Sequence, residues 1–213
     1  MRLGIFGGSF DPVHFGHLRC AEEVREILNI DRIVFVPAGR PPHKKQEELS
    51  PFLHRYEMVK LAIENHPFFE VSEEEGIRGG ISYSIDTVIR FKDSYPVDRD
   101  IFFITGQDAF EAIRTWRDWD RLLNLCHFVV MTRPGYGQAS LEEILSPEVA
   151  SRYSCLKNGC YTGPEGYDIY FIRVTFLDIE GRLMRKWIKE GRSIAFLTPD
   201  SVVKYIVTHQ LYM

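Results

Sequence analysis

The chain has 213 residues, of which 45% are hydrophobic and 26% are charged, and its formal net charge is −4 at pH 7. This length can bury a core without disulfides, and this composition excludes a disordered protein. The negative charge excludes a globally basic protein that coats nucleic acid, and no apolar run reaches the ~20 residues that span a membrane. The apolar stretch at the N-terminus is too short for a signal peptide, so we expect a cytoplasmic protein.

The four cysteines do not have the spacing of a zinc site, since none are two residues apart. Cys20 and Cys126 lie among apolar neighbours, which predicts small core residues. Cys155 and Cys160 could form a local pair, but a reducing cytosol favours free thiols.

Strand and helix patterns alternate from the N-terminus. The apolar run at 2–6, which ends at Gly7-Gly8, predicts a buried strand, and the apolar spacing over 16–28 predicts a helix. The β-branched run at 32–38 predicts a second strand. A crossover of this length implies that the two strands are parallel in a right-handed βαβ unit.

The alternation continues to the end of the chain. Ser50-Pro51 is typical of a helix start, and an apolar stripe at Phe52, Tyr56, Val59 and Ile63 leaves Arg55 and Glu57 on the helix surface. Further strands are predicted at 68–72, 101–105, 127–132 and 168–174, and further helices at 84–91, 108–123, 180–190 and from Thr198-Pro199 onward. The segment 134–168 is less regular, with a short helix at "SLEEIL".

This order of elements predicts the fold class. We expect an α/β fold with a doubly wound, Rossmann-like parallel sheet and helices on both faces. Residues 1–213 should form a single domain, on which a small C-terminal helical part at about 178–213 is packed.

Four polar or glycine-rich loops follow predicted strands. They are "GGSFDPVHFGH" (7–17), "PAGRPPHKK" (37–45), "TGQD" (105–108) and "TRPG" (132–135). Because ligands of open parallel sheets bind at the carboxyl ends of the strands, we expect these loops to form one site.

The first of these loops joins a glycine turn to the start of a helix, where backbone amides and the helix dipole favour an anion. His14 and His17 can both donate N–H groups to oxygen anions, and Gly16 between them would let a phosphate approach closely. The spacing matches neither the dinucleotide-binding nor the P-loop fingerprint. Two histidines three residues apart can also be surface residues or half of a metal site, but the position after the first strand favours a phosphate site.

The sequence "GSFDPVHFGH" resembles the G-x-F-D-P-x-H-x-G-H signature of the HxGH nucleotidyltransferase superfamily. Other segments, in the right order over nearly the whole chain, resemble bacterial nicotinate mononucleotide adenylyltransferases: "RPPHKK" (40–45), "ISYSIDT" (81–87), "ITGQD" (104–108), "TWRDWDRL" (115–122) and "RPG" (133–135). Phosphopantetheine adenylyltransferases are shorter and lack the second loop and the tryptophan segment, and cytidylyltransferases carry a different second signature.

The resemblance implies an enzyme of NAD biosynthesis that transfers AMP from ATP to nicotinate mononucleotide and releases pyrophosphate. Its partners would be these two substrates, and it would bind neither nucleic acid nor a membrane. Whether the protein forms a homo-oligomer stays an open question. Mg²⁺ is expected on the ATP phosphates, and no dedicated metal site is visible in the sequence. The nucleophile, a phosphate monoester, is already anionic and needs no base to activate it, so the task of the site is to hold two polyanions in line.

The same resemblance assigns site residues. The catalytic residues would be His14, His17 and Lys44. ATP would be bound by Gly7, Gly8, Ser9, Phe10, His14, His17, Gly106, Asp108, Arg133 and Arg185. The mononucleotide would be bound by Lys44, Tyr83, Ser84, Thr87, Asp108, Trp116 and Arg117.

Within the mononucleotide site, the pyridine ring needs an apolar, planar surface. Trp116 is the expected stacking residue and Tyr83 the second wall, whereas Trp119, Phe102 and Phe103 are expected in the core. Arg117 could add a complementary charge or could be solvated.

One segment departs from the family pattern. The second ATP signature of the family is Ile-Ser-Ser-Thr-x-Ile-Arg, and the aligned run here is Ile179-Glu180-Gly181-Arg182-Leu183-Met184-Arg185. Arg185 is kept, but the three hydroxyl residues are gone. We expect activity to persist with a raised KM for ATP, with Arg182 replacing part of the lost contacts. Two alternatives stay open, a non-catalytic nucleotide-binding protein and an adenylyltransferase that prefers nicotinamide mononucleotide.

Overall fold

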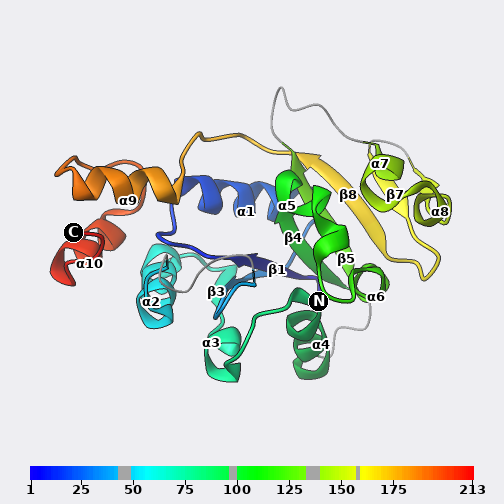
Figure 1. The fold of residues 1–213 in the computed structure, drawn as a ribbon, viewed down its shortest axis with the longest axis horizontal. Coiled ribbons are helices and arrows are strands. Elements are labelled where there is room, and N and C mark those ends of the chain that lie inside the picture. Colours follow the sequence, from blue (N-terminus) through cyan, green and yellow to red (C-terminus); the bar gives the residue numbers. More distant parts are fainter. Residues whose placement is uncertain (43–48, 96–99, 133–139, 157–158) are drawn as a thin grey trace.

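The computed structural model describes residues 1–42, 49–95, 100–132, 140–156 and 159–213. In these residues eight strands form one sheet in the order β3-β2-β1-β4-β5-β8-β7-β6 (Figure 1). The first six strands in this order are parallel: β3 (Phe69–Val71), β2 (Arg32–Pro37), β1 (Leu3–Gly8), β4 (Ile101–Gly106), β5 (His127–Thr132) and β8 (Asp168–Arg173). The strand order reverses between β1 and β4, which is the point of a doubly wound sheet where ligands bind.

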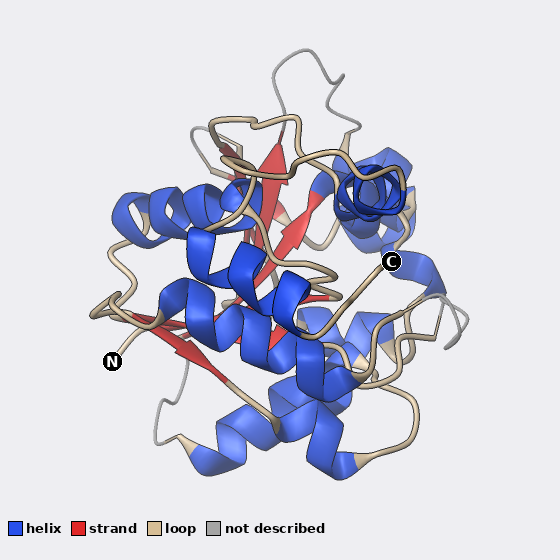
Figure 2. Cartoon of the chain, turned by 90° about the vertical axis from the view of Figure 1, so that its left-hand side faces the viewer, coloured by secondary structure: helices blue, strands red, loops and turns tan. Residues whose placement is uncertain are grey.

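The predicted Rossmann-like fold is confirmed, with helices on both faces of the sheet (Figure 2). One face is covered by α4 (Ser84–Ser94), α5 (Gln107–Glu111), a 3₁₀ turn η2 (Ile113–Thr115), α6 (Trp119–Leu123), α7 (Leu141–Leu145) and α8 (Pro147–Ala150). The other face is covered by α1 (Phe15–Ile27), α2 (Phe52–Ile63), α9 (Gly181–Lys189) and α10 (Asp200–Thr208). The short helix α3 (Glu74–Arg78) is joined to α4 by an ion pair between Glu74 and Arg90.

The central strands are apolar on both sides because both faces are covered. In β1, Leu3 and Ile5 pack in the core under α4 to α8, and Phe6 packs in the core under α1 and α2. The C-terminal helices share this second core through Met184 of α9 and Ile206 of α10. They lie at the α2 end of the molecule, opposite α7 and α8 (Figure 1).

Two predictions about local structure are wrong. The helix predicted over 108–123 is three short pieces, because α5 ends at its C-cap Ala112 (φ −90°, ψ 10°) and because Trp116 is extended (ψ 146°) and Asp118 is left-handed (φ 49°) between η2 and α6. The segment 134–168 holds the short helix predicted at "SLEEIL", which is α7, but the rest of its described part is more regular than expected and holds α8 and a hairpin of β6 (Ser154–Cys155) and β7 (Cys160–Thr162). This hairpin adds to β8 in an antiparallel sense, so the sheet is not wholly parallel.

Candidate active site

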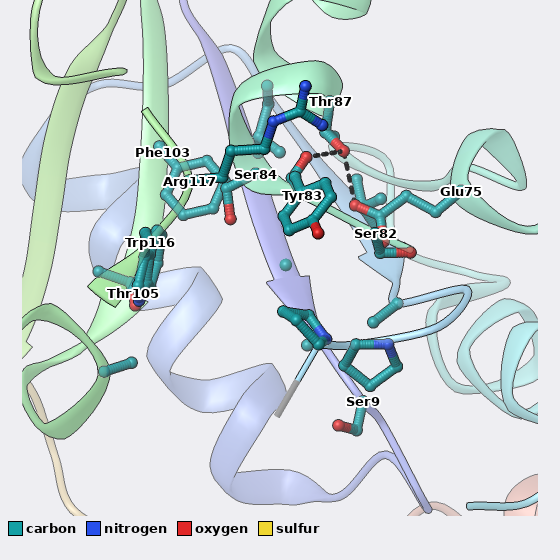
Figure 3. Close-up of a pocket in the computed structure, with 18 of the residues that line it drawn as sticks. Ser9, Glu75, Ser82, Tyr83, Ser84, Thr87, Phe103, Thr105, Trp116 and Arg117 are labelled. Atoms are coloured by element: carbon teal, nitrogen blue, oxygen red, sulfur yellow. Dashed lines mark hydrogen bonds between the residues drawn. The ribbon is translucent and has the colours of Figure 1, made fainter. Parts of the chain in front are cut away.

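Two cavities open at the carboxyl ends of β1 and β4, where the strand order reverses. The apolar cavity, of about 410 Å³, lies between the ends of β1, β2 and β4 and the starts of α4 and η2 (Figure 3). The histidine cavity, of about 330 Å³, lies between residues 9–17, here called the signature loop, and the start of α9. Ser9 lines both cavities, so the two are neighbours at the end of β1.

The two histidines of the histidine cavity act as a pair. His14 is the N-cap of α1, and its ring stacks on that of His17 with the centroids 3.6 Å apart. The backbone N–H of His14 donates to Nδ1 of His17 at 3.3 Å. Because Nδ1 of His17 accepts, the proton of the neutral ring is on Nε2, where it can be donated to a ligand.

Burial keeps His14 neutral in the absence of a ligand. The residue is 7% exposed, and desolvation lowers its pKa to about 4. Its Nδ1 atom is buried and has no hydrogen-bond partner among the described residues. A buried imidazole in this state would gain a partner and a favourable charge from an anion placed beside it.

The glycines near the histidines make room for aromatic rings, and their expected contact with a phosphate stays a prediction. A Cβ on Gly16 would lie 3.0 Å from Nδ1 of His14, so this glycine accommodates the His14 ring. Gly8 belongs to β1, and a Cβ there would meet the ring of Phe10 at 2.9 Å. Phe10 is buried at a positive φ of 47° and packs against His17, with the ring centroids 5.0 Å apart.

Arg185 from α9 reaches the signature loop. Its Nη1 donates to the backbone carbonyl of Asp11 at 2.6 Å and lies 3.7 Å from the Asp11 carboxylate. Arg185 also lines the histidine cavity, so it can support the loop and face a ligand. Arg182 lines the same cavity, with a side chain that is 87% exposed and forms a 4.0 Å ion pair with Glu180.

The apolar cavity gathers the expected mononucleotide residues from two separate segments. Those lining it are Tyr83, Ser84, Thr87, Trp116 and Arg117. Trp116 meets Phe103 edge to face at 5.9 Å, and the guanidinium of Arg117 lies 4.8 Å from the centre of the Tyr83 ring. The break after η2 places Trp116 and Arg117 in the wall of the apolar cavity. In a continuous helix these two residues would lie further along the helix axis.

The structure does not place four expected site residues at these cavities, two because they lie elsewhere and two because they are not described. Gly106 and Asp108 lie at the start of α5 and line neither cavity, and Asp108 is exposed. Lys44 and Arg133 lie outside the described residues. The roles of all four stay predictions.

Arg55 is not on the helix surface as predicted, because it is 1% exposed and supports three loops. Its guanidinium donates to the backbone carbonyls of Ser50 at 2.9 Å, Ser9 at 2.9 Å and Gly39 at 3.3 Å. Burial lowers its pKa from the usual value, although an arginine stays charged at any ordinary pH. Helical periodicity could have predicted this burial, since Arg55 is three residues after Phe52 and four before Val59 and so lies on the apolar stripe of the helix.

Glu75 is a second residue that the sequence interpretation missed. It is buried in the wall of the apolar cavity and accepts the Thr87 hydroxyl at 2.6 Å (Figure 3). It also accepts the Gly39 amide at 3.3 Å. It therefore connects α3, α4 and the loop after β2. No sequence signal distinguishes it from its less buried neighbours Glu73 and Glu74.

Comparison with known proteins agrees with this geometry. Residues 5–195 match the model of the cytidylyltransferase-like family. A protein of Citrifermentans bemidjiense named "Probable nicotinate-nucleotide adenylyltransferase" is 43% identical over 100% of this chain and 99% of its own. The chain belongs to the nicotinate-nucleotide adenylyltransferase family. A Thermoanaerobacter member of the same name is 42% identical over 100% of this chain and 94% of its own.

A solved structure has the same fold. Nicotinic acid mononucleotide adenylyltransferase of Plasmodium falciparum, complexed with NaAD, superposes with a TM-score of 0.73 at 21% identity. The alignment covers 99% of this chain and 97% of that one. Among the described residues, no helix is long and apolar enough to cross a membrane.

Proposed function

We propose that this protein transfers AMP from ATP to nicotinate mononucleotide, which yields nicotinate adenine dinucleotide and pyrophosphate. The observation that carries the proposal is that two cavities of different chemistry are neighbours that share Ser9 in their walls. One offers paired imidazoles and an arginine to a polyphosphate, and the other offers Trp116 and Tyr83 to a planar ring. The relatives named for this reaction support the same assignment.

In this reaction a phosphate oxygen of the mononucleotide attacks the α-phosphorus of ATP. The bond from that phosphorus to the oxygen bridging to the β-phosphate breaks, and pyrophosphate leaves with the electron pair. His17 would donate its Nε2 proton as a hydrogen bond to a phosphate oxygen on which charge builds. Arg185 would add a fixed positive charge, and the loops held by Arg55 would keep the reactants in line.

The donor set of the histidine cavity fits a divalent metal that arrives with ATP. Asp11 is the one carboxylate among the described residues that line this cavity, and its oxygens already accept from Tyr212 at 2.5 Å and Ser50 at 3.2 Å. Mg²⁺ would therefore be held by substrate phosphates and water, where it neutralises charge on the leaving pyrophosphate. The described residues contain no group of three or more His, Cys, Asp or Glu side chains that could hold a metal.

We infer a preference for nicotinate over nicotinamide from one residue at the rim of the apolar cavity. The cation of Arg117 lies beside Tyr83, where it can attract a pyridine carboxylate in addition to its ion pairs with Asp86 at 3.6 Å and Asp118 at 3.8 Å. We infer in addition that residues 1–213 act as one nucleotidyltransferase domain, an inference supported by the core that α9 and α10 share with α1 and α2.

The test is dinucleotide formation from ATP with nicotinate mononucleotide and, separately, with nicotinamide mononucleotide. We expect the adenine dinucleotide and pyrophosphate in equal amounts, faster with the nicotinate, and none after EDTA treatment. His17→Ala is the control for adventitious activity. Failure to form a dinucleotide with either acceptor would contradict the proposal, whereas a preference for nicotinamide mononucleotide would contradict only the acceptor.

A further inference from the structure

The C-terminal end of the chain returns to the active site. Tyr212 is the penultimate residue, and its hydroxyl donates to Oδ1 of Asp11 at 2.5 Å. Asp11 is buried, belongs to the signature loop and lines the histidine cavity. The two residues are thus connected across almost the whole length of the sequence.

The Asp11 carboxylate needs this partner. It lies in a cavity proposed to hold a polyphosphate, where a poorly satisfied carboxylate would repel the ligand. Its Oδ2 accepts the Ser50 amide and lies 3.7 Å from Arg185, while Oδ1 accepts the Tyr212 hydroxyl. Hydrogen bonds to a charged acceptor are about twice as strong as neutral ones, so Tyr212 fixes the carboxylate firmly. Desolvation raises the pKa of Tyr212 far above its usual value, which keeps the phenol a donor.

Further contacts hold the same loop from the same part of the chain. The Thr198 hydroxyl donates to the carbonyl of Val13 at 2.8 Å, and the amide of Phe15 donates to the carbonyl of Leu197 at 2.9 Å. With Asp11, the anchored positions are every second residue of the loop, and His14 lies between two of them. Thr198, which resembled a helix cap in the sequence, therefore serves the signature loop instead.

We propose that Tyr212 is a positioning residue for the ATP half of the active site. Its hydroxyl acts through Asp11 to hold the signature loop so that His14 and His17 face the phosphates. This role rests on the proposed function, because the loop is assigned to ATP there. Tyr212 lies outside residues 5–195, which match the family model.

The experiment compares Tyr212→Phe with Tyr205→Phe. Both variants remove one phenolic hydroxyl from the C-terminal segment, but the Tyr205 hydroxyl contacts Nδ1 of His54 at 3.0 Å, between α10 and α2. Binding of a non-hydrolysable ATP analogue is measured without acceptor, at a temperature where circular dichroism shows all variants folded. We expect Tyr212→Phe to raise the Kd of the analogue and the KM for ATP about tenfold, with the KM for nicotinate mononucleotide within twofold of wild type. Tyr205→Phe should leave all three within twofold.

A second comparison tests the route through Asp11. In a cycle with Asp11→Asn, the loss of ATP-analogue binding caused by Tyr212→Phe should be smaller in the Asp11→Asn background than in wild type, because Asp11→Asn removes the charge of the acceptor that the Tyr212 hydroxyl contacts. Two results would overturn the proposal: a Tyr212→Phe variant that only melts earlier and binds the analogue like wild type, or fully additive losses in the cycle. If wild type binds the analogue but forms no dinucleotide, the proposed function fails while the Tyr212 measurement still stands.

Discussion

The buried state of His14 makes the stability of the protein depend on pH. Its pKa is about 4 in the folded chain, against 6.5 for an ordinary histidine. Between these values the unfolded chain binds more protons than the folded one, so the free energy of unfolding falls as the pH falls. The contribution of neutral His14 is complete above pH 6.5 and is lost as the pH drops to 4. At about 1.4 kcal/mol per pKa unit, the loss amounts to about 3 kcal/mol.

The assay is urea unfolding at several pH values from 7 to 4 for wild type and for His14→Asn, which cannot titrate. All other groups cancel in the difference between the two curves, which should change by about 3 kcal/mol over this range. A bound ATP analogue should flatten the wild-type curve, because an anion beside His14 raises its pKa. A difference that does not change with pH would refute the argument, since it would show that His14 titrates alike in both states.

Three further substitutions test the site. His17→Ala should lower kcat by about 100-fold or more, as for loss of one preorganised donor, with binding of nicotinate mononucleotide unchanged; near-normal turnover would exclude the phosphate role. Trp116→Ala should weaken acceptor binding by about 1–3 kcal/mol, which should appear as a raised KM for nicotinate mononucleotide. The control Trp119→Ala should lower only the melting temperature. Equal effects of Trp116→Ala on the KM values for acceptor and ATP would show that Trp116 is a core residue instead. Arg55→Met should lower the free energy of unfolding by about 3 kcal/mol or more by leaving buried carbonyls unpaired, with exposed Lys60→Met as control; a loss as small as that of the control would contradict the support role.

The order of the central elements could be predicted because each central strand is a continuous apolar run. Runs such as 101–105 are buried on both faces, and the helices between them show clear apolar spacing. The hairpin at 154–162 could not be predicted, because its strands of two and three residues are too short for a period to show. The prediction of one helix after β4 is wrong for a different reason. The residues have helical spacing, but the backbone leaves the helical conformation at Trp116 and Asp118, and local propensity does not reveal this.

Site residues that belong to a sequence motif could be predicted, but site residues that are defined by tertiary contacts could not. His14, His17, Tyr83 and Trp116 were each found from their segment, and the structure places them at the two cavities. The burial of Arg55 could have been predicted from helical periodicity, but its role could not, because its partners are backbone carbonyls of three other positions and backbone groups leave no trace in a sequence. The apparent helix caps Ser50 and Thr198 show the same limit. Each precedes a proline and a helix, yet both contact the signature loop.

The start of α9, where the family's three hydroxyl residues are replaced at 180–182, shows why the family pattern cannot be restored one residue at a time. A Cβ on Gly181 would lie 2.8 Å from the backbone carbonyl of Asp11, so the start of α9 approaches the signature loop more closely than a serine there would allow. Restoring serine at 181 should therefore raise the KM for ATP, not lower it, because α9 and Arg185 would move away from the loop.

We expect Gly181→Ala to raise the KM for ATP and to lower the melting temperature, because the Cβ would meet backbone that cannot rotate aside. Glu180→Ser is the matched control, since the adjacent side chain is 61% exposed and should change neither quantity strongly. Arg182→Ala should raise the KM for ATP by only a few fold, because a solvated charge contributes little. A Gly181→Ala variant with the kinetics and melting temperature of wild type would show that α9 does not set the position of the signature loop. In that case the loss of the family's hydroxyl residues would need an explanation other than the close approach of these two segments.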